Sequence, residues 1–533
     1  MHPALCIDEI LLQVFSYLRP PNNRWNDRYY VGKIRSARKT LASMARTCKL
    51  FSEPALNLLW ERQNSILPLL KVLPTFRRNE NDAYSIVSPI SPEDWERFQS
   101  YARRIHIFIY SSSKSIHSSV FACLAQARGD APLLPSLRHI VWTRSSTFGD
   151  EMVLFVAPSL KIADIGPFGY VSCMDEVETF DGNHGLEVLL DSLVKVASNL
   201  EQLKVEGSLT SACTSSISRL RNLRVLDLSA CGSWSSIQTF QTLATMEHLT
   251  QLQINTLSLG MDGGQTEVPF SSLQILEISG SPSSINSVVR SISSTHLRAI
   301  TIKGTYSYPP EEWQPCCSTL NSRFSNSLRE FRMNLLLGCL SMTKESEDVM
   351  QLIRPLVDIS MLRVVALDLE GHLRVDDADI TSMASAWREL REFRLWCHKS
   401  GNGPSLQSLA ACAAFCPQLA QLELPIDARR LRATNHGHDG DKTGPQAGSP
   451  DSPCPSADVA SFGLRRLTLL GNVGIDDPER VGSRIRGLFP MLRHFEAYAW
   501  DPSMNTMWTQ VKRSLPSLRR TKPREPWVIR KPR

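Results

Sequence analysis

Two small groups of residues have the types and spacing that could bind a metal or a phosphate. His436, His438 and Cys454 offer nitrogen and sulfur ligands of the kind that zinc prefers. Segment 440–443 has the glycine, lysine and threonine of a phosphate-binding loop, but an aspartate interrupts it and the upstream glycine spacing is wrong. Both groups fall within 427–461, which has no aromatic residue and is rich in Gly, Pro, Ser, Asp and His. Such a composition does not offset the entropy of ordering, so we predict a disordered insertion and no metal site.

The remaining cysteines do not form a ligand or catalytic set either. Cys412 and Cys416 fall one helical turn apart and Cys316 adjoins Cys317, but no second pair at ligand spacing accompanies them. The 13 cysteines are scattered, which favours buried thiols in a reducing compartment. The sequence also lacks Gly-x-Ser-x-Gly, His-Glu-x-x-His and a dinucleotide-binding glycine pattern. We therefore expect no catalytic residue, no cofactor and a role other than that of an enzyme.

A phrase of the form Leu-x-x-apolar-x-apolar recurs along most of the chain. Its alternation predicts a strand. Between Leu200 and Leu297 the copies are 23, 26, 24 and 24 residues apart, within the roughly 20–29-residue period of leucine-rich repeats. Later steps are longer, so the array is irregular. The first leucines of the twelve copies are Leu137, Leu200, Leu223, Leu249, Leu273, Leu297, Leu328, Leu362, Leu390, Leu419, Leu464 and Leu492.

Patterns that predict helices lie between these phrases. Apolar residues recur at helical spacing over 186–196, 380–387 and 485–489, and the last two segments follow acidic starts. One strand and one helix cannot bury their apolar faces alone, whereas stacked units share a continuous core. The sequence therefore predicts an α/β fold, with a short all-α module of three helices followed by an irregular leucine-rich-repeat solenoid with a curved parallel sheet.

The open face of that sheet is the predicted recognition surface. Within each phrase, the residues two, four and six positions after the first leucine point away from the core. Aromatic and arginine side chains are favoured anchors of interfaces, and arginines there would suit a phosphate. The alternative is that these side chains pack against a neighbouring loop or the C-terminal tail. The predicted substrate-binding residues are Arg332, Arg394, Trp396, Glu423 and Tyr498.

Three short amphipathic segments lie in the first sixty residues. Apolar residues recur at helical spacing over 10–18, 41–48 and 56–60, and Ser52 to Pro54 are expected to start the third helix. Helices this short are not expected to enclose a core alone, so their apolar faces need a partner. Segment 19–38, which contains Pro20 and Pro21, is predicted as a loop.

These segments resemble an F-box. The run 8–18 is similar to its opening, and 48–52 followed by 58–60 is similar to its close. Segments 64–70 and 92–98 resemble the continuation in F-box proteins of basidiomycete fungi. The resemblance implies the substrate-recognition subunit of an SCF-type ubiquitin ligase, in which the F-box binds a Skp-family adaptor, the adaptor holds a cullin and the repeats hold a protein substrate. The implied adaptor-binding residues are Ile10, Leu11, Val14, Phe15, Leu18, Leu41, Met44, Cys48, Phe51, Leu59 and Trp60.

Two features depart from that family. Cys6 and Ile7 stand where it usually has Leu-Pro, and 19–38 is longer than its usual connection between the first two helices. These departures support an alternative function, a leucine-rich-repeat interaction scaffold that acts outside a ubiquitin ligase. A further alternative makes the first sixty residues an ordinary helical cap on the array.

Charge and composition narrow the remaining classes. The chain has 533 residues, 42% hydrophobic and 21% charged, as expected for a core over most of its length. The net charge of +6 equals that of segment 519–533 alone, and a neutral body argues against a nucleic-acid partner. Asp8 and Glu9 lie where a signal peptide would avoid them, and the sequence lacks an apolar run of about 18 residues, so no membrane partner is predicted. The expected location is the cytoplasm, the nucleus or both.

The predicted organisation has six segments. They are the F-box (1–62), a helical linker and N-terminal cap of the array (63–130), the leucine-rich-repeat array (131–426), the disordered insertion (427–461), the final repeats (462–518) and a basic tail (519–533). The tail, which holds Trp527 among its charges, could be a nuclear-import signal, a clamp for an acidic partner or a solubilising end.

Overall fold

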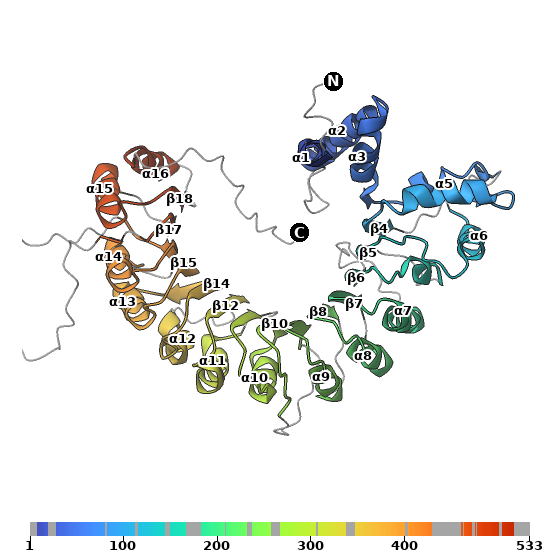
Figure 1. Cartoon of the computed structure of the whole chain (residues 1–533). Coiled ribbons are helices and arrows are strands. Elements are labelled where there is room, and N and C mark those ends of the chain that lie inside the picture. Colours follow the sequence, from blue (N-terminus) through green and yellow to red (C-terminus); the bar gives the residue numbers. More distant parts are fainter. Residues whose placement is uncertain are drawn as a thin grey trace, which may run out of the picture. The chain divides into compact units, whose positions relative to one another are not determined.

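The computed structural model of the chain has two compact units, unit 1 (Met1–Gln253) and unit 2 (Ile254–Arg533), and each is described by itself (Figure 1). Most of the predicted insertion, all of the basic tail and the candidate metal and phosphate ligands at 436–454 lie outside the described residues. The structure describes residues 8–19, 28–79, 83–111, 116–143, 150–166, 183–207, 209–231, 237–256, 267–304, 308–336, 347–399, 403–428, 460–461, 463–471, 475, 477–499 and 504–515.

Unit 1 begins with a module of three helices, α1 (Asp8–Ser16), α2 (Arg28–Met44) and α3 (Lys49–Trp60). Two predictions were wrong here. Residues 28–38 are helical instead of a loop, because their arginine, lysine and alanine residues favour helix and extend α2 toward its amino end. The third helix begins at Lys49, before the predicted start, and Pro54 lies inside it, where it removes one backbone hydrogen bond near the amino end.

A parallel sheet follows in unit 1. Its strands lie in the order β1 (Arg62–Gln63), β4 (Ile107–Ser111), β5 (His139–Thr143), β6 (Ile162–Gly166), β7 (Gln202–Gly207) and β8 (Val225–Cys231). The sheet therefore starts at the boundary between the segments assigned to the F-box and to a helical linker, and β4 lies within the latter. Around it lie α4 (Leu67–Leu70), the antiparallel pair β2 (Phe76–Arg78) and β3 (Tyr84–Ile86), α5 (Pro92–Ala102), α6 (Ser119–Arg128), α7 (Asn183–Val196), α8 (Ser211–Ser218) and α9 (Ile237–Ala244). Strand β9 (Gln251–Asn255) lies at the boundary of the units.

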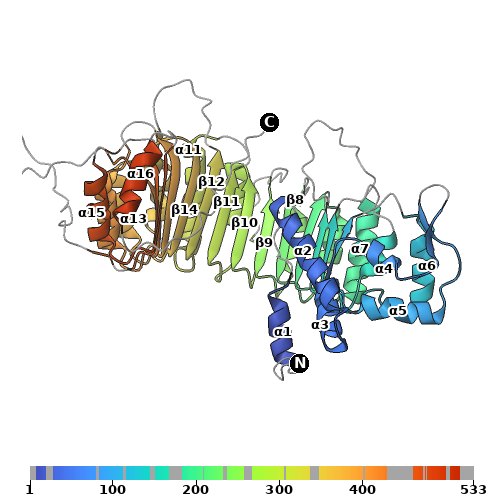
Figure 2. The same cartoon turned by 90° about the horizontal axis from the view of Figure 1, so that it is seen from above.

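Unit 2 has the same plan. Its strands are parallel and follow chain order: β10 (Ile275–Gly280), β11 (Ala299–Gly304), β12 (Glu330–Leu336), β14 (Val364–Arg374), β15 (Glu392–Lys399), β16 (Gln421–Pro425), β17 (Arg466–Gly471) and β18 (His494–Ala499). The short β13 (Glu347–Asp348) pairs with β14. Figure 2 shows β10, β11, β12 and β14 side by side. The helices lie on one side of these strands in Figure 1: α10 (Pro282–Ser291), α11 (Pro310–Phe324), α12 (Val349–Val357), α13 (Asp377–Ala386), α14 (Leu406–Phe415), α15 (Pro478–Leu488) and α16 (Met504–Arg513).

Burial of the repeated leucines confirms the predicted α/β repeat. All twelve phrases become strands, and each strand begins two residues after the first leucine. Leu297, Leu328, Leu362 and Leu390 are all 0% exposed, and each buried leucine contributes roughly 1.5–3 kcal/mol. Polar contacts also join consecutive repeats. The indole N–H of Trp387, for example, donates to a buried carbonyl 3.1 Å away at the end of α12.

Candidate functional site

One side of helix α1 is apolar and exposed. Ile10, Val14 and Tyr17 follow one another at intervals of four and three residues, so they lie along one stripe. Tyr17 is held in the last turn by a hydrogen bond from its backbone N–H to the Val14 carbonyl. The three side chains are 39%, 45% and 81% exposed. We call them the α1 stripe. A contiguous exposed stripe of this kind marks a docking surface more often than three scattered residues would.

The adjoining side of α1 fills the module's own core. Leu11 and Phe15 are 0% and 1% exposed and pack with Leu41 of α2 and Ala55 of α3. The Phe15 ring meets the Phe51 ring edge-on, with centroids 5.7 Å apart. The expectation that these faces need a partner therefore fails for Leu11, Phe15 and Leu41, because apolar residues of α1, α2 and α3 cover one another.

The other residues of the predicted adaptor set lie around that core. Leu18, Met44, Phe51 and Leu59 are partly buried against it. Cys48 precedes α3 and is partly exposed. Trp60 packs on Tyr101 of α5 with ring centroids 4.9 Å apart, so it joins the module to the rest of unit 1. Ile10 and Val14 thus remain as the exposed apolar members of the set. Tyr17, seven residues after Ile10, was missed although its spacing fits.

Unit 2 brings the predicted substrate residues onto neighbouring strands. Arg332 on β12 pairs with Ala366 on β14, Ala366 pairs with Arg394 on β15, and Arg394 pairs with Glu423 on β16. These residues form one row across the sheet. Trp396 lies two residues further along β15, in the next row. Tyr498 lies on β18, with β17 between it and the strand of Glu423.

Both arginines of this row already have carboxylate partners. Arg332 Nη1 lies 2.6 Å from Glu330 Oε2. Arg394 Nε lies 3.2 Å from Glu392 Oε1 and 3.5 Å from Glu423 Oε2. Such half-exposed pairs contribute only about 0–1 kcal/mol each to stability. They nevertheless occupy the guanidinium groups, so the geometry does not favour the hypothesis that these arginines receive a phosphate.

Negative charge is in excess on this face. Burial raises the pKa of Glu423, and the nearby carboxylates of Asp368, Glu392 and Glu496 raise it further, against the opposing effect of Arg394. Burial also raises the pKa of Asp368. Both carboxylates resist ionisation mainly because they are buried and further because of acidic neighbours, and an added positive charge nearby would favour their ionised forms. The open face of unit 2 therefore suits a basic or mixed-charge polypeptide better than an anionic one.

Two aromatic residues lie among these charges. Tyr498 is 38% exposed, and its hydroxyl donates to Glu496 Oε2 at 2.9 Å. Burial, and then the contact with Glu496, raises the pKa of Tyr498 to about 12. The hydroxyl therefore stays a donor at neutral pH. Trp396 is half-buried. Both side chains offer flat apolar area beside polar groups, a combination enriched at interfaces.

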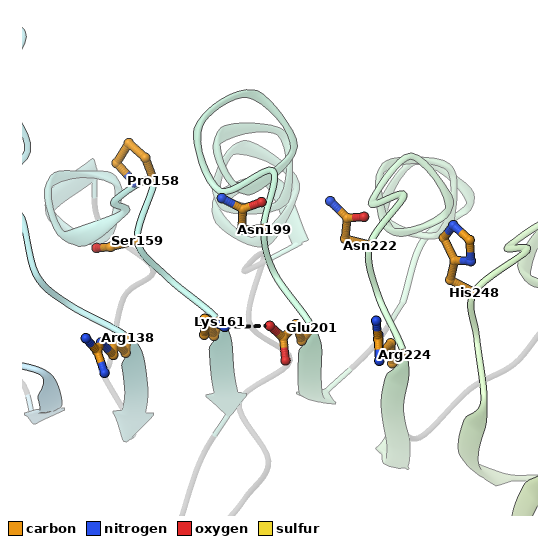
Figure 3. Close-up of a pocket in the computed structure, with 9 residues that line it drawn as sticks. All are labelled: Arg138, Pro158, Ser159, Lys161, Asn199, Glu201, Asn222, Arg224 and His248. Carbon is orange, nitrogen blue, oxygen red and sulfur yellow. Dashed lines mark hydrogen bonds and ion pairs between the residues drawn. The ribbon is translucent and has the colours of Figure 1, made fainter.

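The sequence interpretation missed the residue immediately before each strand, which we call the pre-strand position. In unit 1 it holds Arg138, Lys161, Glu201 and Arg224, before β5, β6, β7 and β8. The backbone N–H of each of the last three donates to the carbonyl of the pre-strand residue before it, at 2.9, 2.8 and 2.8 Å. These four residues line a pocket (Figure 3) together with Pro158, Ser159, Asn199, Asn222 and His248.

The charges in this pocket partly cancel. Lys161 Nζ lies 2.7 Å from Glu201 Oε1, the contact dashed in Figure 3. This hydrogen bond lowers the pKa of Glu201, and the charges of Lys161 and Arg224 lower it further. Apart from Pro158, the residues that line the pocket are polar or charged. It has the character of a solvated surface hollow and does not offer the apolar walls of a small-molecule site.

Metal and thiol chemistry find no support in the described part of the chain. No group of three or more His, Cys, Asp or Glu residues there could hold a metal ion. The prediction of buried thiols is confirmed for Cys316, Cys317, Cys412 and Cys416, and burial raises the pKa of each. Among the described helices, none combines the length and the apolar character needed to cross a bilayer.

Comparison with known proteins identifies no family. No protein-family model and no curated protein matches the chain. Among solved structures, it is similar to a chain of the Rad7 and Elc1 complex of yeast, with 12% identity, a TM-score of 0.35 and coverage of 93% of this chain and 90% of that one. It is also similar to a chain of the TLR13–ssRNA13 complex, with 12% identity, a TM-score of 0.34 and coverage of 74% of this chain and 60% of that one.

Proposed function

We propose that this chain is the substrate-recognition subunit of an SCF-type ubiquitin ligase, related to the F-box proteins of basidiomycete fungi. The observation that carries the proposal is the α1 stripe, which the core of the N-terminal module leaves uncovered. It lies within the segment that resembles the opening of an F-box. Full burial of a valine or isoleucine side chain is worth roughly 1.5–3 kcal/mol. Ile10 and Val14 are already more than half buried, so covering the stripe with a Skp-family adaptor would supply part of that amount at each of them.

In this role the chain breaks no bond. The adaptor links it to a cullin, and the repeats hold a protein substrate in the cytoplasm or the nucleus. Holding both on one scaffold raises the effective concentration of substrate lysines near a charged conjugating enzyme. The proposed substrate surface is the open face of unit 2 around Arg332, Arg394, Trp396, Glu423 and Tyr498, and its excess of carboxylates favours a basic or mixed-charge substrate segment.

Binding of the full chain to a purified Skp-family adaptor tests the first part. Val14→Asp places a charge in the middle of the α1 stripe and should weaken binding at least about 100-fold, because a buried unpaired carboxylate costs several kcal/mol. Ser16→Asp is the matched control. It adds the same charge to the same helix at an exposed position off the stripe. Equal binding by the native chain and Val14→Asp, or no binding by the native chain, would refute adaptor docking through α1.

The substrate surface is tested by comparing proteins that co-purify from the native cell with the native chain and with an Arg394→Ala, Trp396→Ala double variant. Proteins held by the open face should be depleted, whereas the adaptor should be retained, because the two substitutions lie in unit 2 and the α1 stripe in unit 1. Arg138→Ala, at the edge of the unit 1 sheet, is the control. An unchanged set of proteins would contradict the choice of surface.

A leucine-rich-repeat scaffold outside any ubiquitin ligase is the second candidate. The closed core of the N-terminal module favours it, because a module that buries Leu11, Phe15 and Leu41 by itself can serve as a simple cap. This candidate predicts that the open-face variant loses partners while no Skp-family adaptor is recovered with the native chain.

A further inference from the structure

The pre-strand position of unit 2 carries a run of arginines. Arg298 precedes β11, Arg329 precedes β12, Arg363 precedes β14 and Arg391 precedes β15. The backbone N–H of each of the last three donates to the carbonyl of the arginine on the strand before it, at 2.8, 2.7 and 2.8 Å. Neighbouring strands lie roughly 4.8 Å apart, so the four backbones span about 14 Å. We call these four residues the arginine row.

Little of the positive charge in the arginine row is neutralised. Arg363 Nε lies 3.2 Å from Glu389 Oε2. Arg329 donates to two uncharged backbone carbonyls of its own turn. Arg298 and Arg391 are exposed, and among the described residues no carboxylate forms an ion pair with either. One acidic partner for four arginines leaves most of the charge facing solvent.

The nearest acidic residues in the chain turn away from the row. Glu330 directly follows Arg329, but its carboxylate pairs with Arg332 at 2.6 Å on the open face. Glu392 directly follows Arg391, and its carboxylate pairs with Arg394 at 3.2 Å. Alternation along the strand explains both, because successive side chains point in different directions. Unit 2 therefore separates its charges. Carboxylates are in excess on the open face, and the guanidinium groups of the row lie at the amino-terminal ends of the strands.

The same position in unit 1 lacks this property. There Glu201 interrupts the basic residues and pairs with Lys161 at 2.7 Å. A run of like charges on four consecutive strands is therefore not a requirement of the fold. Four positive charges on neighbouring strands create a local positive potential that would attract an anion.

The shape of the row restricts the kind of anion. The residues two positions before its four arginines, on the neighbouring turns, are His296, Ser327, Met361 and Glu389. None is lysine or arginine, so at this position the basic strip does not widen into the broad basic surface that a duplex or a membrane requires. None is tyrosine, phenylalanine or tryptophan, so the strip lacks the stacking platform typical of single-stranded nucleic-acid sites. The Arg363–Glu389 pair shows that a carboxylate fits the row.

We propose that the arginine row binds an extended segment of a partner protein rich in aspartate and glutamate. In an extended chain, side chains on one side recur about every 6.7 Å, and flexible arginine side chains on strands about 4.8 Å apart can follow that spacing. The inference is independent of the proposed ligase role, because the row lies at the amino-terminal ends of the strands. It includes no residue of the α1 stripe or of the proposed substrate surface.

Fluorescence anisotropy with the full chain tests this proposal. The probe is a labelled peptide of six Glu-Ser repeats, and the uncharged reference is six Gln-Ser repeats. The Glu-Ser peptide should bind, with an affinity that falls as NaCl is added, and the Gln-Ser peptide should not. A double variant, Arg298→Gln with Arg391→Gln, should weaken binding about tenfold, because charge-assisted hydrogen bonds to arginine are roughly twice as strong as neutral ones. Both positions are exposed, so the fold should be unaffected.

The matched control makes the same changes at the same repeat position in unit 1, as Arg138→Gln with Arg224→Gln. It should change the affinity less than about twofold, because Glu201 already offsets that strip. Equal weakening by the two double variants would show diffuse electrostatics and overturn the site. Tighter binding of a single-stranded oligonucleotide, a phosphorylated peptide or an anionic vesicle through Arg298 and Arg391 would overturn the class of partner. Absence of Glu-Ser binding would overturn both.

Discussion

Phe15→Ala should unfold the N-terminal module and leave the repeats folded. Phe15 is 1% exposed and is one of four fully buried residues in that core. Replacing a buried phenylalanine with alanine costs about 3–5 kcal/mol, of which roughly 0.5–1.5 kcal/mol is the edge-on contact with Phe51. A helical unit of this size rarely has more than about 3–5 kcal/mol of stability. The substitution therefore removes an amount comparable with the whole stability of the module.

Hydrogen exchange read by mass spectrometry measures this loss region by region. In Phe15→Ala, backbone amides of α2 and α3 should exchange as in an unfolded chain, whereas those of β10 to β15 should keep their native protection. Val14→Asp is the control for the neighbouring position. Its side chain is 45% exposed, so the change should cost less than about 1 kcal/mol and leave protection intact. The two substitutions thus separate folding of the module from docking on its surface.

Retained protection of α2 and α3 in Phe15→Ala would refute this reasoning. The module would then be held mainly by its contacts with the rest of unit 1. Two such contacts are visible, the stacking of Trp60 on Tyr101 and the ion pair between Arg104 and Glu53 at 2.8 Å. Adaptor binding by a variant whose module is unfolded would likewise exclude the α1 stripe as the docking surface.

Three further outcomes are expected. The pKa of Glu423 is higher in the folded state than in the unfolded state. The stability that its protonated form contributes is therefore present at low pH and is lost as the pH rises from the unfolded-state pKa through the folded-state pKa. Glu423→Gln should therefore raise the free energy of unfolding at pH 7, by less than about 1 kcal/mol, and leave it unchanged at pH 3.5. Trp387→Phe removes the donor to the buried Leu356 carbonyl and should lower the free energy of unfolding in urea by about 1–3 kcal/mol. Burial raises the pKa of Cys316 to about 12, so iodoacetamide should spare it in the native protein and modify the partly exposed Cys123.

The repeat plan could be read from the sequence because every unit buries the same positions. A leucine followed at fixed offsets by two apolar residues places each strand, and the register that results aligns Phe331, Val365 and Phe393 in one buried layer. Two strands of the repeat, β4 and β6, were not predicted because their copies of the phrase match it poorly. The copy at β4 begins with Ile105, and that at β6 has the small Ala163 at the first of its two apolar positions. The helix starts at Asp376 and Asp477 could be predicted because capping is local. Each capping carboxylate accepts hydrogen bonds from backbone N–H groups two or three residues further along the chain.

The candidate sites were harder to predict because their partners come from other strands. Alternation placed Arg394 on the open face, but its contact with Glu423 depends on the register between β15 and β16, which neither strand specifies alone. In α1, Val14 and Phe15 belong to adjoining apolar stripes. The sequence does not specify which stripe faces the other helices, so both were assigned to the adaptor.

Charge summed over the chain is a poor guide to partners for a repeat protein. Residues 1–518 are neutral in total, and that neutrality argued against a nucleic-acid partner. In unit 2, however, each repeat sends one set of side chains to the open face and another to the pre-strand edge, so charges of opposite sign accumulate on separate surfaces. Glu392 and Arg391 are neighbours in sequence and contribute to different surfaces. Salt screens the potential of charges more than about 10 Å away, so a partner in contact with one surface responds to the charges of that surface. It would therefore meet one sign of charge or the other. The charge at each repeat position, taken strand by strand, is therefore the quantity that bears on recognition.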